Sequence, residues 1–217
     1  MPKYAKSRQN SLIGFENMAT PRRDELVETA LKLFYTGGFN ATGIDKILGE
    51  SGVAKMTLYN HFRSKDELIL AALRRRDEKF RNWLMGEMKK AGPAPRAQIL
   101  AMFDALEDWF EGNAFKEFGF YGCAFINAAS EFGDQKHPAH RMAAEHKQSV
   151  VDHLERICRK AGATSPLELA EQLALIKEGA IATAHVRGMP GAAQTAKLVA
   201  AALMDATLGP DTSAGHL

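Results

Sequence analysis

The side chains best suited to reading nucleic acid gather in one short stretch, Ala54 to Phe62. Hydrogen-bond donors and aromatic rings that can face the phosphates and base edges of a DNA groove fill its outward positions: Lys55, Thr57, Tyr59, Asn60 and His61. A three-residue turn, 51–53, joins this stretch to a second short helical pattern at 42–50. Two short helices around such a turn make a helix-turn-helix, although an ordinary αα-hairpin fits the same periodicity.

Each of these helices is too short to be stable alone, so the pair needs an apolar contact between them. Ile47, Val53 and Leu58 are placed to supply that contact. We expect Phe39 and Phe62, with Leu58, to form the core of this small domain rather than to face a partner.

Apolar residues recur at three- and four-residue spacing along almost the whole chain, and no segment alternates with the period of two that a strand shows. Proline, glycine and capping residues mark the helix ends; Ser64 with Glu67, for example, forms a capping box that opens a long helix. The sequence therefore predicts an all-α fold of about nine helices, at 21–37, 42–50, 54–62, 64–90, 99–110, 123–132, 138 to beyond 157, 165–187 and 190–208.

Composition narrows the class of protein. The chain has 217 residues, 46% hydrophobic and 25% charged, with a formal net charge of +2. These values suit a globular protein with a full core and argue against disordered and disulfide-scaffold classes. No apolar run approaches the roughly 20 residues of a membrane-spanning helix, and the short apolar stretch at 12–15 cannot serve as a signal-peptide core. We expect a cytoplasmic protein with no membrane partner and two reduced cysteines.

Three segments, taken in order, resemble the DNA-binding domain of TetR-type transcriptional repressors: 38–42, 52–62 and 64–68. The family's usual form is G-V-S-x-x-x-L-Y-x-[HY]-F followed by S-K-[ED]-[ED]-L, and this chain reads GVAKMTLYNHF and SKDEL. The close resemblance covers roughly residues 21–72. Two positions depart from it. Ala54 stands where Ser is common, which removes an N-cap hydroxyl, and Met56 stands where a small residue is frequent.

The resemblance implies that 54–62 is the recognition helix, which enters the major groove of operator DNA. It also implies that Lys65 meets a phosphate at the start of the long helix, while Thr42 caps its own helix and contacts a phosphate. Lys and Arg outnumber Asp and Glu in residues 1–80, which agrees with a polyanionic partner. The residues expected to contact DNA are Thr42, Lys55, Met56, Thr57, Tyr59, Asn60, His61 and Lys65.

The same resemblance divides the chain into a DNA-binding domain at 21–66 and a ligand-binding and dimerisation domain at 67–208, flanked by an N-terminal arm at 1–20 and a tail at 209–217. Residues 1–17 are either a basic arm that touches DNA or a dispensable upstream start before Met18. We expect a homodimer formed through the final two helices, whose many alanines permit close approach, although packing within one chain explains the same alanines.

The resemblance places an effector site among the middle helices, where aromatic side chains with few polar groups suit a small, largely apolar or aromatic molecule. The same aromatic residues serve equally well as plain core, and a buried histidine usually bonds a neighbouring carbonyl or carboxylate. Cys123 is either an oxidation sensor or a small buried hydrophobe. The candidate effector residues are Trp83, Phe103, Leu106, Trp109, Phe110, Cys123, Phe125, Ile126, Asn127, His146 and Val150.

No enzyme motif is present: the chain has no phosphate-binding glycine loop, no His-Glu-x-x-His and no Gly-x-Ser-x-Gly. The histidines at 137, 140, 146 and 153 lack convincing metal-ligand spacing, so we expect neither a metal nor a cofactor. The expected function is a ligand-responsive regulator, most simply a repressor released from a palindromic operator. The alternatives are a redox-responsive regulator acting through Cys123 and a DNA-binding protein without an effector.

Overall fold

The computed structural model describes residues 21–208, and the expectations for residues 1–20 and 209–217 lie outside them. Within that range the chain forms helices and no strand, which confirms the predicted all-α class. No helix in this part of the chain is long and apolar enough to cross a bilayer. The helices are α1 (Pro21–Gly37), α2 (Ile44–Ser51), α3 (Lys55–His61), α4 (Lys65–Lys90), α5 (Pro95–Phe110), α6 (Ala124–Glu131), α7 (Pro138–Lys160), α8 (Pro166–Arg187) and α9 (Ala192–Leu208).

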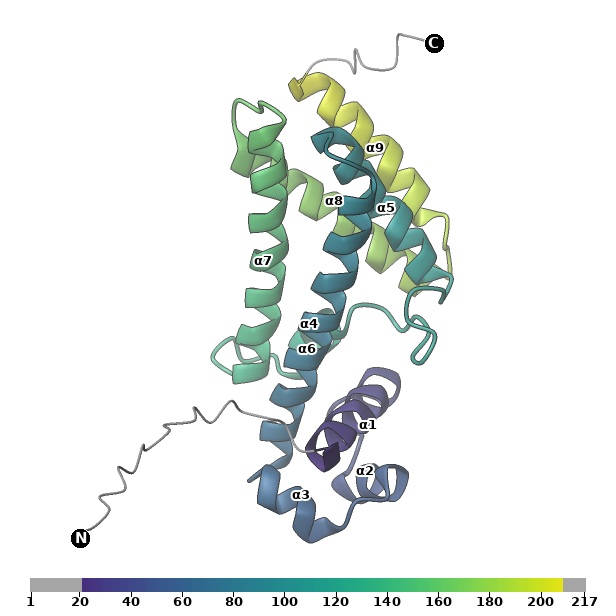
Figure 1. Cartoon of the computed structure of the whole chain (residues 1–217), viewed down its shortest axis with the longest axis vertical. Helices are drawn as coiled ribbons and strands as arrows, with labels where there is room; N and C mark the ends of the chain where they lie inside the picture. Colours follow the sequence, from purple (N-terminus) through teal and green to yellow (C-terminus); the bar gives the residue numbers. More distant parts are fainter. Residues whose placement is uncertain (1–20, 209–217) are drawn as a thin grey trace, which may run out of the picture.

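The long helix α4 joins the two ends of the molecule (Figure 1). Its first turns pack against α1, which with α2 and α3 forms a small unit at one end. Its later turns pack against α5 and α7, and α8 and α9 complete the larger end. A shift of α4 relative to either unit therefore reaches the other.

Local sequence explains most of the helix ends. Gly38 and Gly52 follow α1 and α2 with φ angles of +87° and +65°, a left-handed conformation that glycine adopts without a steric cost. The predicted capping box is present at the start of α4. The Ser64 hydroxyl accepts from the Glu67 N–H at 3.2 Å, and the Glu67 carboxylate accepts the Arg63 N–H at 2.8 Å.

The prediction that Thr42 is the N-cap of α2 is wrong. Gly43 occupies the cap position, and no side chain caps the helix there. The Thr42 side chain is buried instead, and its hydroxyl donates to the Leu33 carbonyl of α1 at 3.2 Å. Packing of the turn against α1 thus overrides the local preference of threonine for a cap.

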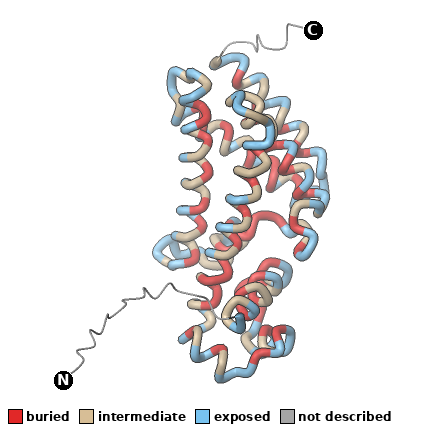
Figure 2. The backbone as a smooth tube through the Cα atoms, in the orientation of Figure 1, coloured by how far each residue is buried: buried red, intermediate tan, exposed pale blue. Residues whose placement is uncertain are grey.

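Buried residues follow the inner faces of the helices along the whole length of the molecule (Figure 2). The residues predicted to form the core of the small domain, Phe39, Leu58 and Phe62, are all buried. The inward stripes predicted for α5 and α7 are buried as well, including Phe103 and Val150. The same core also holds charged and polar side chains, namely Arg76, Lys177 and His146.

Candidate functional site

The outward side of α3 carries most of the side chains that the sequence assigns to DNA. Lys55, Met56, Tyr59 and Asn60 are exposed, and the fractional exposure of Met56 reaches 75%. They lie within about 140° of one another around the helix because each residue turns the chain by about 100°. Leu58 points the other way and is fully buried, so it fixes which side of α3 faces outward. Thr57 and His61 are half-buried and lie outside this arc.

Two residues assigned to phosphate contacts have partners inside the protein. Lys65 Nζ donates to the Asn40 carbonyl at 3.0 Å, and Thr42 is buried against Leu33. Both therefore hold the turn between α1 and α2 in place. Lys55 keeps only a loose, exposed ion pair with Asp45 at 3.6 Å, which leaves its ammonium accessible to a phosphate.

Two sets of hydrogen bonds tie the small unit to the larger one. The Glu131 carboxylate, at the end of α6, accepts the backbone N–H groups of Phe39 and Asn40 at 2.8 and 2.7 Å. The Tyr35 hydroxyl, near the end of α1, donates to the Gly122 carbonyl at 2.8 Å. The same hydroxyl accepts the Tyr121 N–H at 3.0 Å. The segment before α6 and the end of α6 thus both hold the end of α1 and the turn that follows it.

The effector residues proposed from sequence fall into two neighbouring groups. The first is an aromatic cluster around Trp109, whose ring centroid lies 5.8 Å from that of Phe110 and 6.4 Å from that of Trp83. Phe103 and Leu106 are fully buried on the same helix, α5. Most of these side chains are closed into the core, as the plain-core interpretation expects.

The second group lies between α6 and α7. The rings of Phe125 and His146 stack with centroids 3.7 Å apart, and Val150 is buried one turn further along α7. Phe80 joins the two groups, since its ring lies 5.0 Å from Trp109 and 5.6 Å from His146. The structure therefore brings most of the proposed effector residues into one continuous region.

Two proposed effector residues lie at its margin. Ile126 is exposed and lines a shallow surface pocket between α6 and α7. The Asn127 side chain donates to the Tyr121 carbonyl at 3.1 Å, so its amide holds the segment before α6. Asn127 thus supports the same segment that contacts Tyr35.

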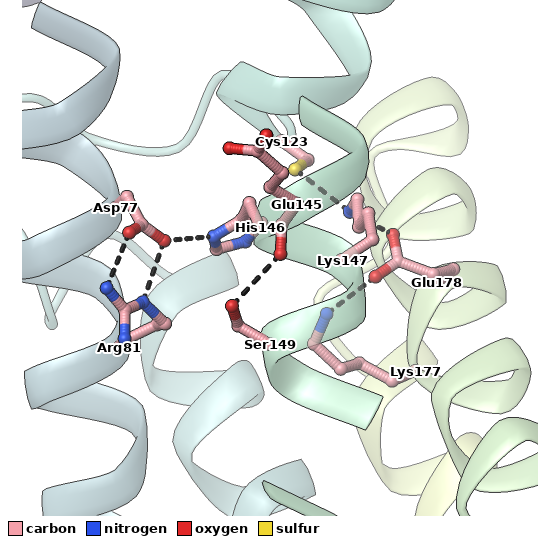
Figure 3. Close-up of polar contacts among 9 residues, drawn as sticks. All are labelled: Asp77, Arg81, Cys123, Glu145, His146, Lys147, Ser149, Lys177 and Glu178. Atoms are coloured by element: carbon pink, nitrogen blue, oxygen red, sulfur yellow. Dashed lines mark hydrogen bonds and ion pairs between the residues drawn. The ribbon is translucent and has the colours of Figure 1, made fainter. Parts of the chain in front are cut away.

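His146 is held by a carboxylate (Figure 3). Its Nδ1 lies 2.7 Å from Oδ1 of Asp77, which also receives two hydrogen bonds from Arg81 at 2.8 and 2.6 Å. Burial lowers the pKa of His146 to about 4, against the opposing effect of Asp77, so the imidazole is neutral at pH 7. Burial alone would raise the pKa of Asp77, but its bonds to His146 and Arg81 lower it to about 2.

A second polar group lies on the other side of α7 (Figure 3). Lys147 Nζ donates to Cys123 Sγ at 3.2 Å and to Glu178 at 2.5 Å, and Lys177 Nζ donates to Glu178 at 2.6 Å. Burial would raise the pKa of Glu178, but the two ammonium groups lower it to about 2. Burial also lowers the pKa of Lys177, the more deeply buried lysine. One carboxylate therefore serves two cations here.

Arg76 and Lys177 were missed because only apolar residues were assigned to the core face of each helix. Arg76 nevertheless lies in phase with Leu73 and Phe80 on α4, and Lys177 lies in phase with Leu173 on α8, so their helical spacing could have marked them. Burial lowers the pKa of the Arg76 guanidinium. A buried donor without a partner costs about 1–3 kcal/mol, and more when it is charged. Such a residue in a core needs a reason beyond packing.

The last two helices leave an apolar surface uncovered in the single chain. Val186 and Leu198 are 80% and 73% exposed, and Leu175 is exposed as well. A groove of about 410 Å³ runs between α8 and α9, lined by small and apolar side chains that include Gly179, Ala196 and Val199. Most of the alanines noted in the sequence are buried within the chain, so they bring α8 close to α9.

Known proteins share both ends of this architecture. Residues 26–72 match the family model described as "Bacterial regulatory proteins, tetR family", and residues 95–211 match the model described as "Tetracyclin repressor-like, C-terminal domain". A solved TetR-family transcriptional regulator from Streptomyces coelicolor is 29% identical and superposes with a TM-score of 0.78, over 86% of this chain and 96% of that one.

Two curated relatives are regulators. The HTH-type transcriptional regulator YjdC of Escherichia coli is 23% identical over 160 residues, which cover 74% of this chain and 81% of YjdC. The HTH-type transcriptional activator FasR of Mycolicibacterium smegmatis is 34% identical over 94 residues, 42% of this chain and 43% of FasR. The family and these relatives are regulators of transcription rather than enzymes.

Proposed function

This chain belongs to the TetR family of bacterial DNA-binding transcriptional regulators, and we propose that it is a dimeric repressor released from a palindromic operator by a small effector. The observation that carries the proposal is the arrangement of α3, which buries Leu58 and turns Lys55, Met56, Tyr59 and Asn60 outward. A helix with one exposed polar side and one buried apolar side can lie in the major groove with the first while the second stays in the core.

The dimer is supported by the apolar surface on α8 and α9. Exposed apolar side chains that gather on two neighbouring helices, as Val186 and Leu198 do, mark an interaction surface more often than single exposed ones. A second copy that covers this surface would place two recognition helices side by side. Two such helices read two half-sites, which explains why the operator should be palindromic.

Release by an effector is supported by the contacts between the two units. A small, largely apolar or aromatic molecule among the aromatic side chains of α4, α5 and α6 would shift the segment before α6. That segment bonds Tyr35, and the end of α6 bonds Phe39 and Asn40. The effector then changes operator affinity by its differential affinity for the two arrangements, typically 1–3 kcal/mol.

The DNA-binding part of the proposal is tested directly by selecting the sequences that the protein binds from a pool of random duplexes. We expect a motif with twofold symmetry and half-sites about one helical turn apart, protected in footprinting by the dimer. A reporter transcribed across that motif should be lower in cells that contain the protein. No enriched motif would refute sequence-specific binding. A higher reporter signal would show activation and refute the repressor assignment alone.

A second candidate function, regulation by oxidants, is favoured by the contact between Lys147 and Cys123 at 3.2 Å. Cysteines beside a cationic group are typical of sites that oxidants attack. Cys158 provides a matched control, because burial raises its pKa to about 11 and keeps it a thiol. Under this hypothesis peroxide releases the operator from the wild type and from Cys158→Ser but not from Cys123→Ser. Equal release from all three proteins, or from none, would refute it.

A further inference from the structure

Arg76 presents its guanidinium to a ring of aromatic side chains on the core side of α4. Its Cζ lies 4.3 Å from the centroid of the Phe115 ring and 5.0 Å from that of Tyr35, with three further rings within 5.9 Å. Ring faces attract the cation but leave its directed N–H donors unused. Nη1 and Nη2 of Arg76 and Nε1 of Trp109 are buried and make no hydrogen bond of normal geometry among residues 21–208. Burial raises the pKa of Tyr35, and the Trp109 N–H is close enough to the Tyr35 hydroxyl to oppose that effect.

The carboxylates around this part of the core are already engaged. Glu117, which is close enough to oppose the lowering of the Arg76 pKa by burial, pairs with Lys79 at 3.8 Å. Asp77 receives its hydrogen bonds from Arg81 and His146. Glu178 receives those of Lys147 and Lys177. The interior therefore has more cationic donors than acceptors to satisfy them.

The Arg76 guanidinium lies over the Trp109 ring. The Arg76 Cζ is 5.6 Å from the Trp109 ring and 5.6 Å from the Phe80 ring, and Lys177 Nζ approaches the same Phe80 ring at 5.9 Å. A planar carboxylate fits two parallel N–H groups of a guanidinium, and an indole N–H adds a third donor. A single negative charge matches Arg76, the cation among the buried side chains of residues 21–208 whose terminal nitrogens have no acceptor, whereas a phosphate dianion would need more donors than these.

We propose that the effector is a monocarboxylate with an aromatic or acyl body, and that its carboxylate is bound by Arg76 and Trp109. This inference rests on the proposed function for its regulatory consequence, but not for the binding itself. The aromatic rings around Trp109, including Phe110 and Phe120, pack against one another, so the apolar body would lie among them only after it had pushed them apart. The assignment adds a charged head group to the largely apolar effector expected from the sequence.

Binding at Arg76 also has a route to the DNA-binding unit. Phe115 and Phe118 belong to the segment between α5 and α6, and both rings lie over the guanidinium. A ligand that enters must displace this segment. Its far end, at Tyr121 and Gly122, bonds the Tyr35 hydroxyl of α1. Occupancy of Arg76 and the position of α1 are thus linked through one short stretch of chain.

The test uses the full chain without DNA and a panel of monocarboxylates: phenylacetate, phenylpropionate and the fatty acids from hexanoate to palmitate. Each is paired with its primary amide, which has the same body and no charge. Binding is read from thermal unfolding and from the combined emission of the two tryptophans, Trp83 and Trp109, both of which lie in the aromatic cluster. The variants are Arg76→Met, which keeps the apolar stem of the side chain and removes the guanidinium, and Lys160→Ala, which removes an exposed cation at the end of α7.

We expect at least one carboxylate to raise the unfolding temperature and change the tryptophan emission, with binding of its amide at least tenfold weaker. Arg76→Met should abolish this binding without lowering the unfolding temperature of the ligand-free protein, because the unpartnered charge does not stabilise the fold. Lys160→Ala should bind as the wild type does. A clear loss of ligand-free stability in Arg76→Met would assign the guanidinium to the fold and overturn the proposal.

Binding of no carboxylate in the panel, or equal binding of carboxylate and amide, would overturn it as well. Operator binding separates this result from the proposed function. Carboxylates that bind at Arg76 without releasing the operator would refute effector release and leave the site standing. Neutral amides that release the operator would refute the anionic head group and leave effector release standing.

Discussion

Glu131 and Phe39 lie on opposite sides of the boundary between the two units, and the Glu131 carboxylate accepts the Phe39 N–H at 2.8 Å. The same carboxylate accepts the Asn40 N–H, and the Asn40 carbonyl accepts from Lys65. The turn between α1 and α2 is therefore held from both units. Gly38 permits this approach, since a Cβ at that position would lie 3.3 Å from the Glu131 carboxylate.

Glu131→Gln should release this turn. The amide retains one acceptor oxygen but loses the charge and places N–H groups against a backbone N–H. We expect a loss of about 1–2 kcal/mol in the free energy of unfolding. Hydrogen exchange at the Phe39 and Asn40 amides should become at least tenfold faster. Glu155→Gln, which removes only a surface pair with Arg159, is the matched control. Unchanged protection of both amides in Glu131→Gln would contradict this reasoning.

The protein should lose stability as the pH decreases from about 6.5 to 4, because of His146. The unfolded chain takes up a proton near the ordinary histidine pKa of 6.5, but the folded chain does so only near 4. The contribution is therefore complete above pH 6.5 and is lost as pH falls toward 4, by on the order of 2–3 kcal/mol. Asp77 and Glu178 act at lower pH, below their ordinary values of 3.8 and 4.5.

Denaturant unfolding at a series of pH values measures this slope. His146→Gln should remove most of the dependence of stability on pH between pH 6.5 and 4.5, whatever the stability of the variant at pH 7. His153→Gln is the control, because burial also lowers the pKa of His153 but the residue is only half-buried. If His146→Gln retained the full slope, another group would have to be responsible.

Lys55→Ala should weaken binding to all DNA sequences. Its ammonium has only a loose ion pair with Asp45, so it is available to a phosphate. Loss of one phosphate contact in each protomer reduces the slope of log affinity against log salt by about two for a dimer. Lys160→Ala should leave the slope unchanged. An unaltered slope in Lys55→Ala would exclude Lys55 from the phosphate contacts.

Ala54→Ser should stabilise the recognition helix. Ala54 occupies the N-cap of α3, and no side chain there bonds the first turn. A serine hydroxyl can accept one of the free N–H groups, which is worth about 1 kcal/mol at such a position. We expect a higher denaturation midpoint and tighter operator binding. Ala54→Val, which offers no acceptor, should show neither gain. A gain in Ala54→Val that is absent from Ala54→Ser would contradict the capping argument.

Val186→Glu and Leu198→Glu should each weaken the dimer at least a hundredfold, because each would bury a charge in the apolar surface on α8 and α9. Sedimentation equilibrium measures the change. Leu167→Glu is the control, since Leu167 is also exposed on α8 but lies nine residues before Ile176, on the opposite side of the helix from the groove. If the dimer persists in both Val186→Glu and Leu198→Glu, it must use another surface.

The helices could be predicted closely from the sequence because proline, glycine and capping residues mark their ends locally. Thr42 shows the limit of that reasoning, since its hydroxyl bonds α1 rather than capping α2. The contacts of Tyr35 and Glu131 join residues about 90 positions apart, and no periodicity brings such pairs together. Arg76 was within reach of the sequence, because its phase on α4 places a charge where only apolar residues were expected.

Gly122 lies where three distant parts of the chain meet. Its carbonyl accepts from Tyr35 at 2.8 Å, and its φ of +77° suits glycine. A Cβ there would stand 2.9 Å from the His185 ring near the end of α8. A side chain at this position must therefore be matched by a change at His185, whereas the carbonyl that Tyr35 bonds is present in any residue. Across related genes positions 122 and 185 should drift as a pair, and Gly122 should be the slower of the two to change.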